Sequence, residues 1–434
     1  MSGKSDESHH NRQLSKWAAD PQLLSRLASE IRQHSQPYPD LTTQGRGVDE
    51  DTRVLVYRAP KIVVQVPGHE WFGTVGSSQA VLRFPNPELW NGKLVIGATP
   101  AVRGSRSLDW LVSDLVLQRG YAYAASDKGT PGLILRDPNR QMTEWVENYE
   151  ILTKAAQLVC GLIYDKSVTR TYVLGVSNGG YLTRRLLEST GDLFDGGVEW
   201  EGVFHHPDSH PLLESLPILL QNYPVFKNFR GDRTRAEQTA AQAAMIDAGL
   251  HPDSSPYWRT YYSVYWMVSL WLYGRNLDPG WKPFEQPWNN DWIKDPAVLA
   301  SYPWSERKDL VRPRMERISN TGQLQKPMLS VAGNWDCLLP FPHHAEAYAQ
   351  LVKSSGRAAY HRLYEIHGGN HVDGLLRTEL GRQQPVLPYF EAAFHYVEDW
   401  VERSVEPPQS GFFQRIEEFY PHHRTDLYSL GKDE

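Results

Sequence analysis

The sequence predicts an α/β fold built on a doubly wound, mostly parallel sheet. Between residues 93 and 204, β-rich apolar runs alternate with segments whose apolar residues recur at helical spacing. This alternation is typical of βαβ units, in which a helix connects two parallel strands. The clearest unit is 171–188, where an apolar run leads through a Gly-containing turn to Tyr181, Leu182, Leu186 and Leu187 at helical spacing.

The other elements are expected from the same two periodicities, near 2 for strands and near 3.6 for helices. Asp20 and Pro21 begin a short helix that runs to His34. Further strands are expected at 53–57, 61–66, 79–84, 93–98, 121–126, 198–204 and 360–366. Further helices are expected at 108–119, 139–164, 234–249, 257–273, 342–353 and 388–404.

Composition excludes several classes of protein. The chain of 434 residues is 40% hydrophobic, which is enough for a large core. Its net charge of −6 offers no basic surface for nucleic acid or an anionic membrane, and it has no apolar run long enough to span a bilayer. The two cysteines have neither disulfide-framework nor metal-ligand spacing. The polar N-terminus lacks the apolar core of a signal peptide, so we expect a cytoplasmic protein that acts on a small molecule.

The turn in 171–188 is Gly175-Val176-Ser177-Asn178-Gly179, a Gly-x-Ser-x-Gly motif between a strand and a helix. In this context the motif predicts an elbow that holds Ser177 in a strained conformation with its hydroxyl exposed as a nucleophile. The alternative is an ordinary Ser-Asn-Gly-Gly turn. Because the first turn of a helix has free backbone N–H groups, the Asn178 N–H is expected to donate to a developing oxyanion.

Two downstream segments complete a pattern that begins with Ser177. Residues 326–340 form an apolar run and a turn that contains Asp336, and the strand at 360–366 leads into His367-Gly368-Gly369-Asn370-His371. The order Ser, Asp, His, each after a strand, resembles the α/β-hydrolase superfamily.

The resemblance covers about residues 50–205 and 320–405 and implies a catalytic triad of Ser177, Asp336 and His371. In such a triad the imidazole accepts the serine proton, and the carboxylate orients the imidazole and stabilises its cation. His367 remains an alternative to His371 because it sits at the end of the strand. Glu365 and Asp373 are weaker alternatives to Asp336 and are expected to be solvated.

The loop Thr99-Pro100-Ala101-Val102-Arg103-Gly104-Ser105 matches the position of the second oxyanion donor in this fold. The N–H of Ala101 is the first candidate and that of Thr99 the second, and an ordinary loop is the alternative. Neither a cofactor nor a metal is expected, since the run His205–His210 is interrupted by proline and contains no two-His helix motif. Strand alternation places Glu199 and Glu201 on one face.

Asp336 follows Ser177 by 159 positions, which is far more than one further βα unit requires. We therefore expect an inserted helical cap at 206–319. Fourteen of the 48 residues from 257 to 304 are aromatic, against 12% in the whole chain. These rings either pack the cap onto the core or form an aromatic wall over the substrate pocket. The flanking parts are an N-terminal arm with a short helix (1–50) and a C-terminal tail (406–434), which wraps the surface or an oligomer partner.

Short segments indicate a branch of the superfamily. Trp90-Asn91-Gly92-Lys93, 118–122 and 177–180 resemble tannase, feruloyl-esterase and hydroxyalkanoate-oligomer hydrolase relatives. Tannases carry linked cysteines directly before the serine and the histidine, whereas Val176 and Asn370 occupy those places here. This difference argues against a secreted tannase.

These observations predict a serine hydrolase that cleaves carboxylic esters of a bulky or aromatic substrate. One alternative is a peptidase or acyltransferase with the same triad, since an acyl-enzyme can also be resolved by an amine or alcohol once water is excluded. The other is a catalytically silent homologue that binds a small molecule beneath the cap. Neither a nucleic acid nor a membrane is expected as a partner. The sequence is compatible with a homo-oligomer.

Overall fold

The computed structural model describes residues 20–48, 55, 61–130, 142–285, 297–377 and 383–421. Its centre is a ten-stranded sheet with the order β1-β2-β3-β5-β4-β6-β7-β8-β9-β10. Neighbouring strands are antiparallel from β1 to β5 and parallel from β5 to β10, which confirms the predicted sheet. The strands are β1 (Gln36–Tyr38), β2 (Gly68–Val75), β3 (Ser78–Pro85), β4 (Lys93–Ala98), β5 (Ala122–Ser126), β6 (Arg170–Val176), β7 (Gly196–Trp200), β8 (Met328–Gly333), β9 (His361–Ile366) and β10 (Gly411–Phe413).

Helices cover both faces of the sheet. A Cβ on Gly196 would meet Val397 of α16 (Leu387–Arg403) at 3.1 Å, whereas a Cβ on Gly197 would meet Leu187 of α6 (Asn178–Ser189) at 3.0 Å. Because consecutive strand residues point to opposite faces, α6 and α16 lie on opposite sides. The helix α5 (Glu144–Tyr164) packs beside α6, and α2 (Pro21–His34) packs against α5.

Most core elements follow the sequence, but the strand expected at 61–66 does not form. The expected strand at 61–66 is irregular, because the Val66 N–H bonds the Asp40 carboxylate and the Val66 carbonyl accepts from the Leu41 N–H. The first strand after this segment is β2, which begins at Gly68. The expected strand at 53–57 lies outside the described residues except for Leu55, as do the first residues of the helix expected at 139–164.

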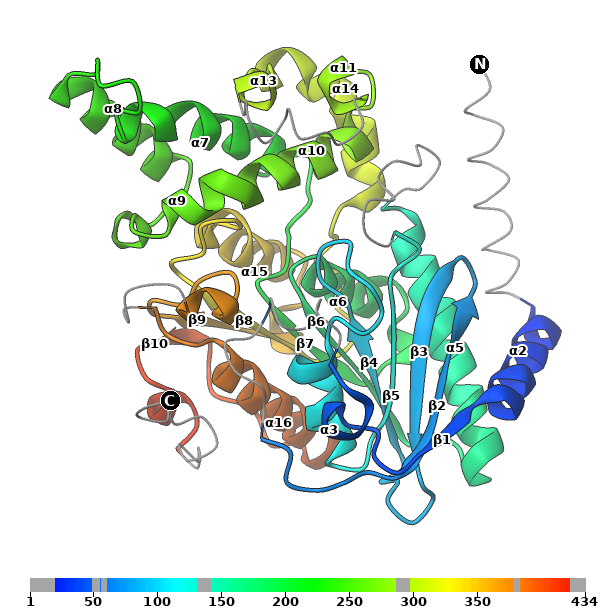
Figure 1. Cartoon of the computed structure of the whole chain (residues 1–434). Coiled ribbons are helices and arrows are strands. Elements are labelled where there is room, and N and C mark those ends of the chain that lie inside the picture. The colour runs from blue at the N-terminus through cyan, green and yellow to red at the C-terminus, as the bar shows by residue number, and fades with distance from the viewer. Residues whose placement is uncertain are drawn as a thin grey trace.

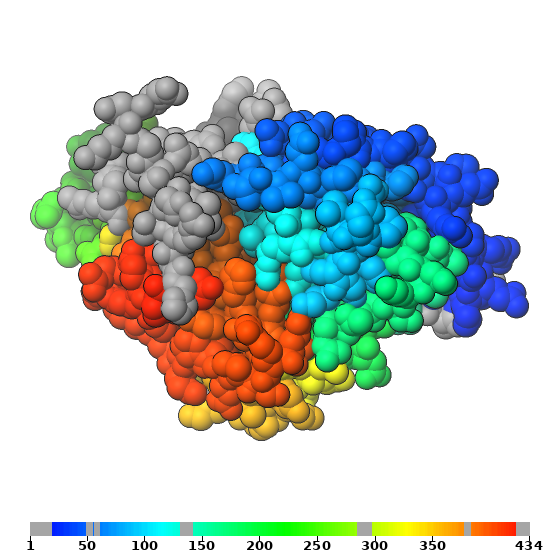
Figure 2. Space-filling view, turned by 90° about the horizontal axis from the view of Figure 1, so that it is seen from below, coloured from blue at the N-terminus to red at the C-terminus, as the bar shows by residue number. Residues whose placement is uncertain are grey.

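Strands from the arm and the tail extend the sheet beyond the predicted core ranges. In the arm, β1 pairs antiparallel with β2, and in the tail, β10 pairs parallel with β9. Figure 2 shows the blue N-terminal part of the chain lying against the cyan part, with the orange and red C-terminal part beside them. The two ends of the described chain are therefore part of the sheet architecture.

Several helices begin or wind differently from the expected ones. The segment expected to be helical at 108–119 starts with a π-helical turn, η2 (Asp109–Ser113), which continues as α4 (Asp114–Leu117). A short helix, α3 (Thr43–Arg46), lies in the arm. The helix α15 (Ala345–Ser354) follows the acid-bearing loop, and α17 (Ile416–Phe419) follows β10.

The inserted segment is helical and lies above the sheet, as the green and yellow ribbons of Figure 1 show. Its capping box at Thr234 is confirmed, whereas α7 and α14 had no sequence prediction. The helices are α7 (Leu212–Phe226), α8 (Arg235–Asp247), α9 (Trp258–Thr260), η6 (Tyr261–Tyr265), α10 (Trp266–Leu277), α11 (Lys282–Glu285), α13 (Ala297–Ala300) and α14 (Trp304–Ile318). Among the helices of the described residues, none combines the length and apolar character needed to cross a membrane.

Candidate active site

Ser177 lies at the turn between β6 and α6 with φ 57° and ψ −118°. This left-handed backbone is unfavourable for a residue with a Cβ and is typical of a nucleophile elbow. The flanking glycines are required sterically, since a Cβ on Gly175 would lie 2.2 Å from the Gly179 carbonyl oxygen and one on Gly179 would lie 1.8 Å from the Ala98 carbonyl oxygen. Only glycine fits at these two positions, and the closely packed backbone around them holds Ser177 in its strained conformation.

The structure brings Ser177, His371 and Asp336 into one hydrogen-bonded chain. The Ser177 Oγ lies 3.1 Å from His371 Nε2, and His371 Nδ1 lies 2.8 Å from Asp336 Oδ2. The other carboxylate oxygen, Asp336 Oδ1, accepts the N–H groups of Leu338 at 2.7 Å and Leu339 at 2.8 Å. All three triad side chains are buried, so the carboxylate and imidazole are held in one geometry.

The alternative triad residues are placed elsewhere. The His367 N–H bonds the Phe413 carbonyl of the edge strand, and its ring lies 5.9 Å from that of Trp335. Glu365 accepts the side-chain amide of Asn334 at 3.0 Å. Asp373 is buried rather than solvated and accepts two N–H groups at the start of α16, and burial raises its pKa to about 7.

A second carboxyl group, Glu201, lies beside Asp336. Strand alternation predicted that Glu199 and Glu201 share a face, but β7 ends before Glu201, whose φ of 50° turns its side chain. Glu199 pairs with Arg184, whereas Glu201 accepts the Gly333 N–H and hydrogen-bonds Asp336. Burial, together with the Asp336 charge, raises the pKa of Glu201 well above its usual range. Glu201 can therefore be neutral and donate to the Asp336 carboxylate.

The loop after β4 approaches the elbow at Ala101, which has φ 44°. The Asn178 side-chain amide donates to the Ala101 carbonyl at 3.2 Å. The alternative donor, the Thr99 N–H, is already bonded to the Tyr149 hydroxyl at 3.0 Å. Among the sequence candidates in this loop, Ala101 is therefore favoured over Thr99.

Lys128 supports the same loop from below, and no sequence signal pointed to it. Its ammonium nitrogen donates to the Thr99 carbonyl at 2.8 Å and to the Thr99 hydroxyl at 2.7 Å. Complete burial lowers the pKa of Lys128 to about 7. An extended strand followed by Asp-Lys-Gly gives no indication of this burial, which arises only when α5 covers the residue.

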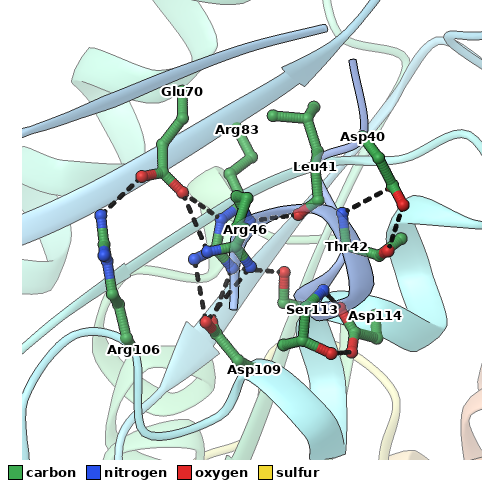
Figure 3. A network of polar contacts seen from close by, with 11 residues as sticks. Asp40, Leu41, Thr42, Arg46, Glu70, Arg83, Arg106, Asp109, Ser113 and Asp114 are labelled. Atoms are coloured by element: carbon green, nitrogen blue, oxygen red, sulfur yellow. Dashed lines mark hydrogen bonds and ion pairs between the residues drawn. The ribbon is translucent and has the colours of Figure 1, made fainter. Parts of the chain in front are cut away.

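A buried network of ions lies beyond the loop (Figure 3). Arg83 bonds Glu70 at 2.8 Å and Asp109 at 2.6 Å, and Arg46 from the arm contacts the same two carboxylates. Arg106, at the end of the loop, bonds the other Glu70 oxygen at 2.6 Å. The network thus ties the loop and η2 to β2, β3 and the arm.

A cavity of about 220 Å³ opens onto Ser177. Among the aromatic residues described between 257 and 304, Tyr265 and Tyr273 line it, whereas Trp258, Trp266 and Trp271 are buried in packing. The wall is mainly aliphatic and includes Leu55, Pro100, Val102, Val264, Val268, Leu272, Leu338, Leu339 and Val372. Most of the described aromatic rings of the inserted segment therefore serve packing.

The histidine-rich run after β7 is also used in packing. The His205 ring lies 5.0 Å from that of Tyr181 and 5.5 Å from that of Tyr273, and His210 stacks on His343 at 4.3 Å. In the part of the chain that the structure describes, no three His, Cys, Asp or Glu residues form a metal-binding group. No described cluster therefore offers a place for a metal.

Comparison with known proteins found one matching family model and several solved structures with a similar fold. A family model described as 3HB-oligomer hydrolase matches residues 297–416. No curated protein matches the chain. An esterase from Aspergillus oryzae is similar in structure, with a TM-score of 0.50, 14% identity, and coverage of 80% of this chain and 82% of the esterase.

Two further structures overlap a similar share of the chain. Feruloyl esterase B from Aspergillus oryzae has a TM-score of 0.49 and 13% identity, with coverage of 82% of this chain and 86% of that one. Tannin acyl hydrolase from Aspergillus niger has a TM-score of 0.48 and 14% identity, with coverage of 88% and 87%. The strand order, the elbow and the similarity to the first esterase together show that this chain has the fold of the α/β-hydrolase superfamily.

Proposed function

We propose that this protein is a serine hydrolase that cleaves carboxylic esters through an acyl-enzyme. The observation that carries the proposal is the chain from Ser177 Oγ through His371 to Asp336, with distances of 3.1 and 2.8 Å. A serine hydroxyl is a weak nucleophile unless an imidazole accepts its proton, and a carboxylate on the far nitrogen holds the imidazole in the required tautomer. The contact between Ser177 and His371 supports the first role, and the contact between His371 and Asp336 supports the second.

The reaction proceeds in two steps. Ser177 Oγ attacks the acyl carbon while His371 Nε2 takes the hydroxyl proton, and the imidazolium then protonates the leaving alcohol. In the second step His371 takes a proton from water as the water oxygen attacks the acyl carbon. The imidazolium then returns this proton to Ser177 Oγ as the bond between Oγ and the acyl carbon breaks and the acid leaves. The N–H groups of Asn178, at the start of α6, and Ala101 are the proposed donors to the oxyanion of both tetrahedral intermediates.

The cavity supports a bulky apolar substrate group. Its volume of about 220 Å³ exceeds the ~150 Å³ of an apolar cavity that holds benzene, so a branched aliphatic group or an aromatic ring would fit. The description of the matching family, 3HB-oligomer hydrolase, supports an ester as the scissile bond. We therefore propose esters of bulky or aromatic acids, with oligoesters of hydroxyalkanoates included among the candidates.

The proposal is tested by labelling with a fluorophosphonate probe and locating the modified peptide by mass spectrometry. Label on Ser177 is expected in the wild type and is expected to be lost in folded Ser177→Ala and His371→Ala. Hydrolysis of matched esters and anilides, with and without an alcohol acceptor, then separates esterase from peptidase and acyltransferase activity. A folded wild type that takes no label and leaves activated esters intact would refute the mechanism.

A further inference from the structure

Three aromatic side chains of the cap each donate a hydrogen bond to a residue adjacent in sequence to a triad residue. The Tyr273 hydroxyl donates to Asn178 Oδ1 at 2.6 Å, directly after Ser177. The Trp266 indole N–H donates to the Cys337 carbonyl at 2.6 Å, directly after Asp336. The Tyr261 hydroxyl donates to Asn370 Oδ1 at 2.7 Å, directly before His371. The cap therefore contacts all three catalytic loops through specific donors.

The three donors come from one continuous helical run, η6 and α10. In an α-helix, residues five apart would lie about 140° apart around the axis. Between Tyr261 and Trp266 the run has a π-helical turn, in which the Trp266 N–H bonds the Tyr261 carbonyl. This turn brings Tyr261 towards the face of Trp266, and Tyr273 follows two α-helical turns later on that face. The π-helical turn thus aligns the three donors towards the core.

Each bond is part of a wider contact at the site. The Asn178 amide that receives Tyr273 also donates to the Ala101 carbonyl at 3.2 Å, so it connects the two residues proposed to hold the oxyanion. Asn370 Oδ1, which receives Tyr261, also accepts the N–H groups of His371 at 2.8 Å and Cys337 at 3.3 Å. Asn370 therefore links the histidine loop to the acid loop, at the position where tannases have a cysteine.

Both tyrosine hydroxyls are suited to act as permanent donors. Tyr261 and Tyr273 are buried, and burial raises the pKa of each phenol above its ordinary value. The Asn178 and Asn370 oxygens would be left without these donors if the cap moved away. Because the accepting residues are adjacent to the triad, a shift of the cap would be transmitted directly to the reacting side chains.

We infer that the cap positions the triad and the oxyanion loop through Tyr261, Trp266 and Tyr273, so that hydrolysis depends on a docked cap. The inference rests on the proposed function. Tyr261 and Trp266 are absent from the lining of the cavity, and they act through the neighbouring loops as positioning residues. Misplacing reacting groups by as little as about 1 Å can lower a rate about 100-fold, which makes such positioning measurable.

The test compares Tyr261→Phe and Tyr273→Phe with a matched control, Tyr302→Phe. Tyr302 is also buried in the cap, but its hydroxyl donates at 2.9 Å to Asp278, within the cap. We expect kcat to fall about 10- to 100-fold in the first two variants and to stay within about twofold in the control. KM should stay within about twofold in Tyr261→Phe. Equal kcat in the three variants, or a loss that tracks thermal stability alone, would overturn the inference.

A spectroscopic readout keeps the inference separate from the proposed function. The His371 imidazole N–H shared with Asp336 is assigned in the one-dimensional proton spectrum as the resonance that His371→Ala removes. We expect it to shift or broaden in Tyr261→Phe and to stay in place in Tyr302→Phe, whether or not the wild type turns over any ester. An unchanged resonance in Tyr261→Phe would overturn positioning even if labelling establishes the nucleophile. If Tyr261→Phe does not fold, Trp266→Phe is compared in the same way.

Discussion

The loop proposed to bind the oxyanion and the loops of the proposed triad are supported by two regions of opposite chemistry. Beyond the loop that carries Ala101, Arg46 and Arg83 pair with Glu70 and Asp109, and Arg106 pairs with Glu70 (Figure 3). Above the triad, the cap uses neutral donors, two phenols and one indole, on amide and carbonyl oxygens. One region is held by buried charges and the other by neutral hydrogen bonds.

The difference indicates what each region contributes. Removing one partner of a buried ion pair leaves an uncompensated charge and costs about 3–5 kcal/mol, whereas a neutral hydrogen bond contributes about 1 kcal/mol net. Damage to the ion network should therefore appear first as lost stability. Damage to the cap donors should appear first as lost activity, because their acceptors adjoin the reacting groups.

The largest stability effect is expected for Arg83→Met. The Arg83 side chain is fully buried, and its removal leaves Glu70 and Asp109 facing a reduced positive charge. We expect the free energy of unfolding in urea to fall by about 3–5 kcal/mol. The control is Lys93→Met, which breaks the partly exposed pair with Glu402 and should cost less than about 1 kcal/mol. Similar losses in the two variants would refute the contrast between buried and surface charge.

The second prediction concerns the pH dependence of stability at the edge of the same network. Burial raises the pKa of Asp114 from 3.8 to about 6, although Thr43 donates two hydrogen bonds to it. A raised folded-state pKa means that folding favours the protonated carboxyl. Its contribution to stability is complete below about pH 4 and is lost as the pH rises through about 6.

Asp114→Asn imitates the neutral carboxyl and should remove this dependence. As the pH rises from 4.5 to 7.5, we expect the free energy of unfolding of the variant to increase relative to that of the wild type, by at most about 3 kcal/mol. Urea unfolding at the two pH values measures the change. A difference between the two proteins that does not vary with pH would show that Asp114 does not take up a proton on folding.

The smallest effect is expected for Thr234→Ala, at the start of α8 in the cap. The Thr234 hydroxyl accepts the Glu237 N–H at 3.2 Å, and the Glu237 carboxylate accepts the Thr234 N–H at 2.7 Å. Loss of this capping box should cost about 1 kcal/mol of unfolding free energy and leave kcat unchanged. A kcat loss as large as that of Tyr261→Phe would mean that the cap acts through its general stability and not through its three donors.

Local and chain-order information was sufficient to predict much of the fold and the triad candidates. A Gly-x-Ser-x-Gly turn needs only a strand before it and a helix after it, and both follow from the periodicity around Ser177. The strand at 93–98 is confirmed at both ends, since the apolar residues 94–98 follow the Asn91-Gly92 turn and precede the loop that begins at Thr99. His371 follows the strand expected at 360–366, and Asp336 follows an apolar run that resembles the acid-bearing strand of the superfamily.

The errors arose where long-range contacts override a local pattern. Residues 61–66 have the composition of a strand, but the Val66 backbone bonds the arm and the Val63 N–H bonds the Gln118 side chain. The pairing of β1 and β10 to the sheet edges depends on segments distant in sequence. Glu201 leaves the face predicted by alternation because β7 ends at Trp200, whereas the sequence predicted a strand that continues to 204.

The sequence by itself determined the alternating sheet, the serine elbow and the order of the candidate triad, since these depend on spacing along the chain and on residue chemistry. Only the tertiary structure decided which carboxylate and histidine approach Ser177, which lysine and arginines are buried, and which cap aromatics reach the catalytic loops. The physical reason is that burial, hydrogen-bond partners and pKa shifts depend on residues that lie far apart in the sequence, such as Ser177 and His371, which are separated by 194 positions.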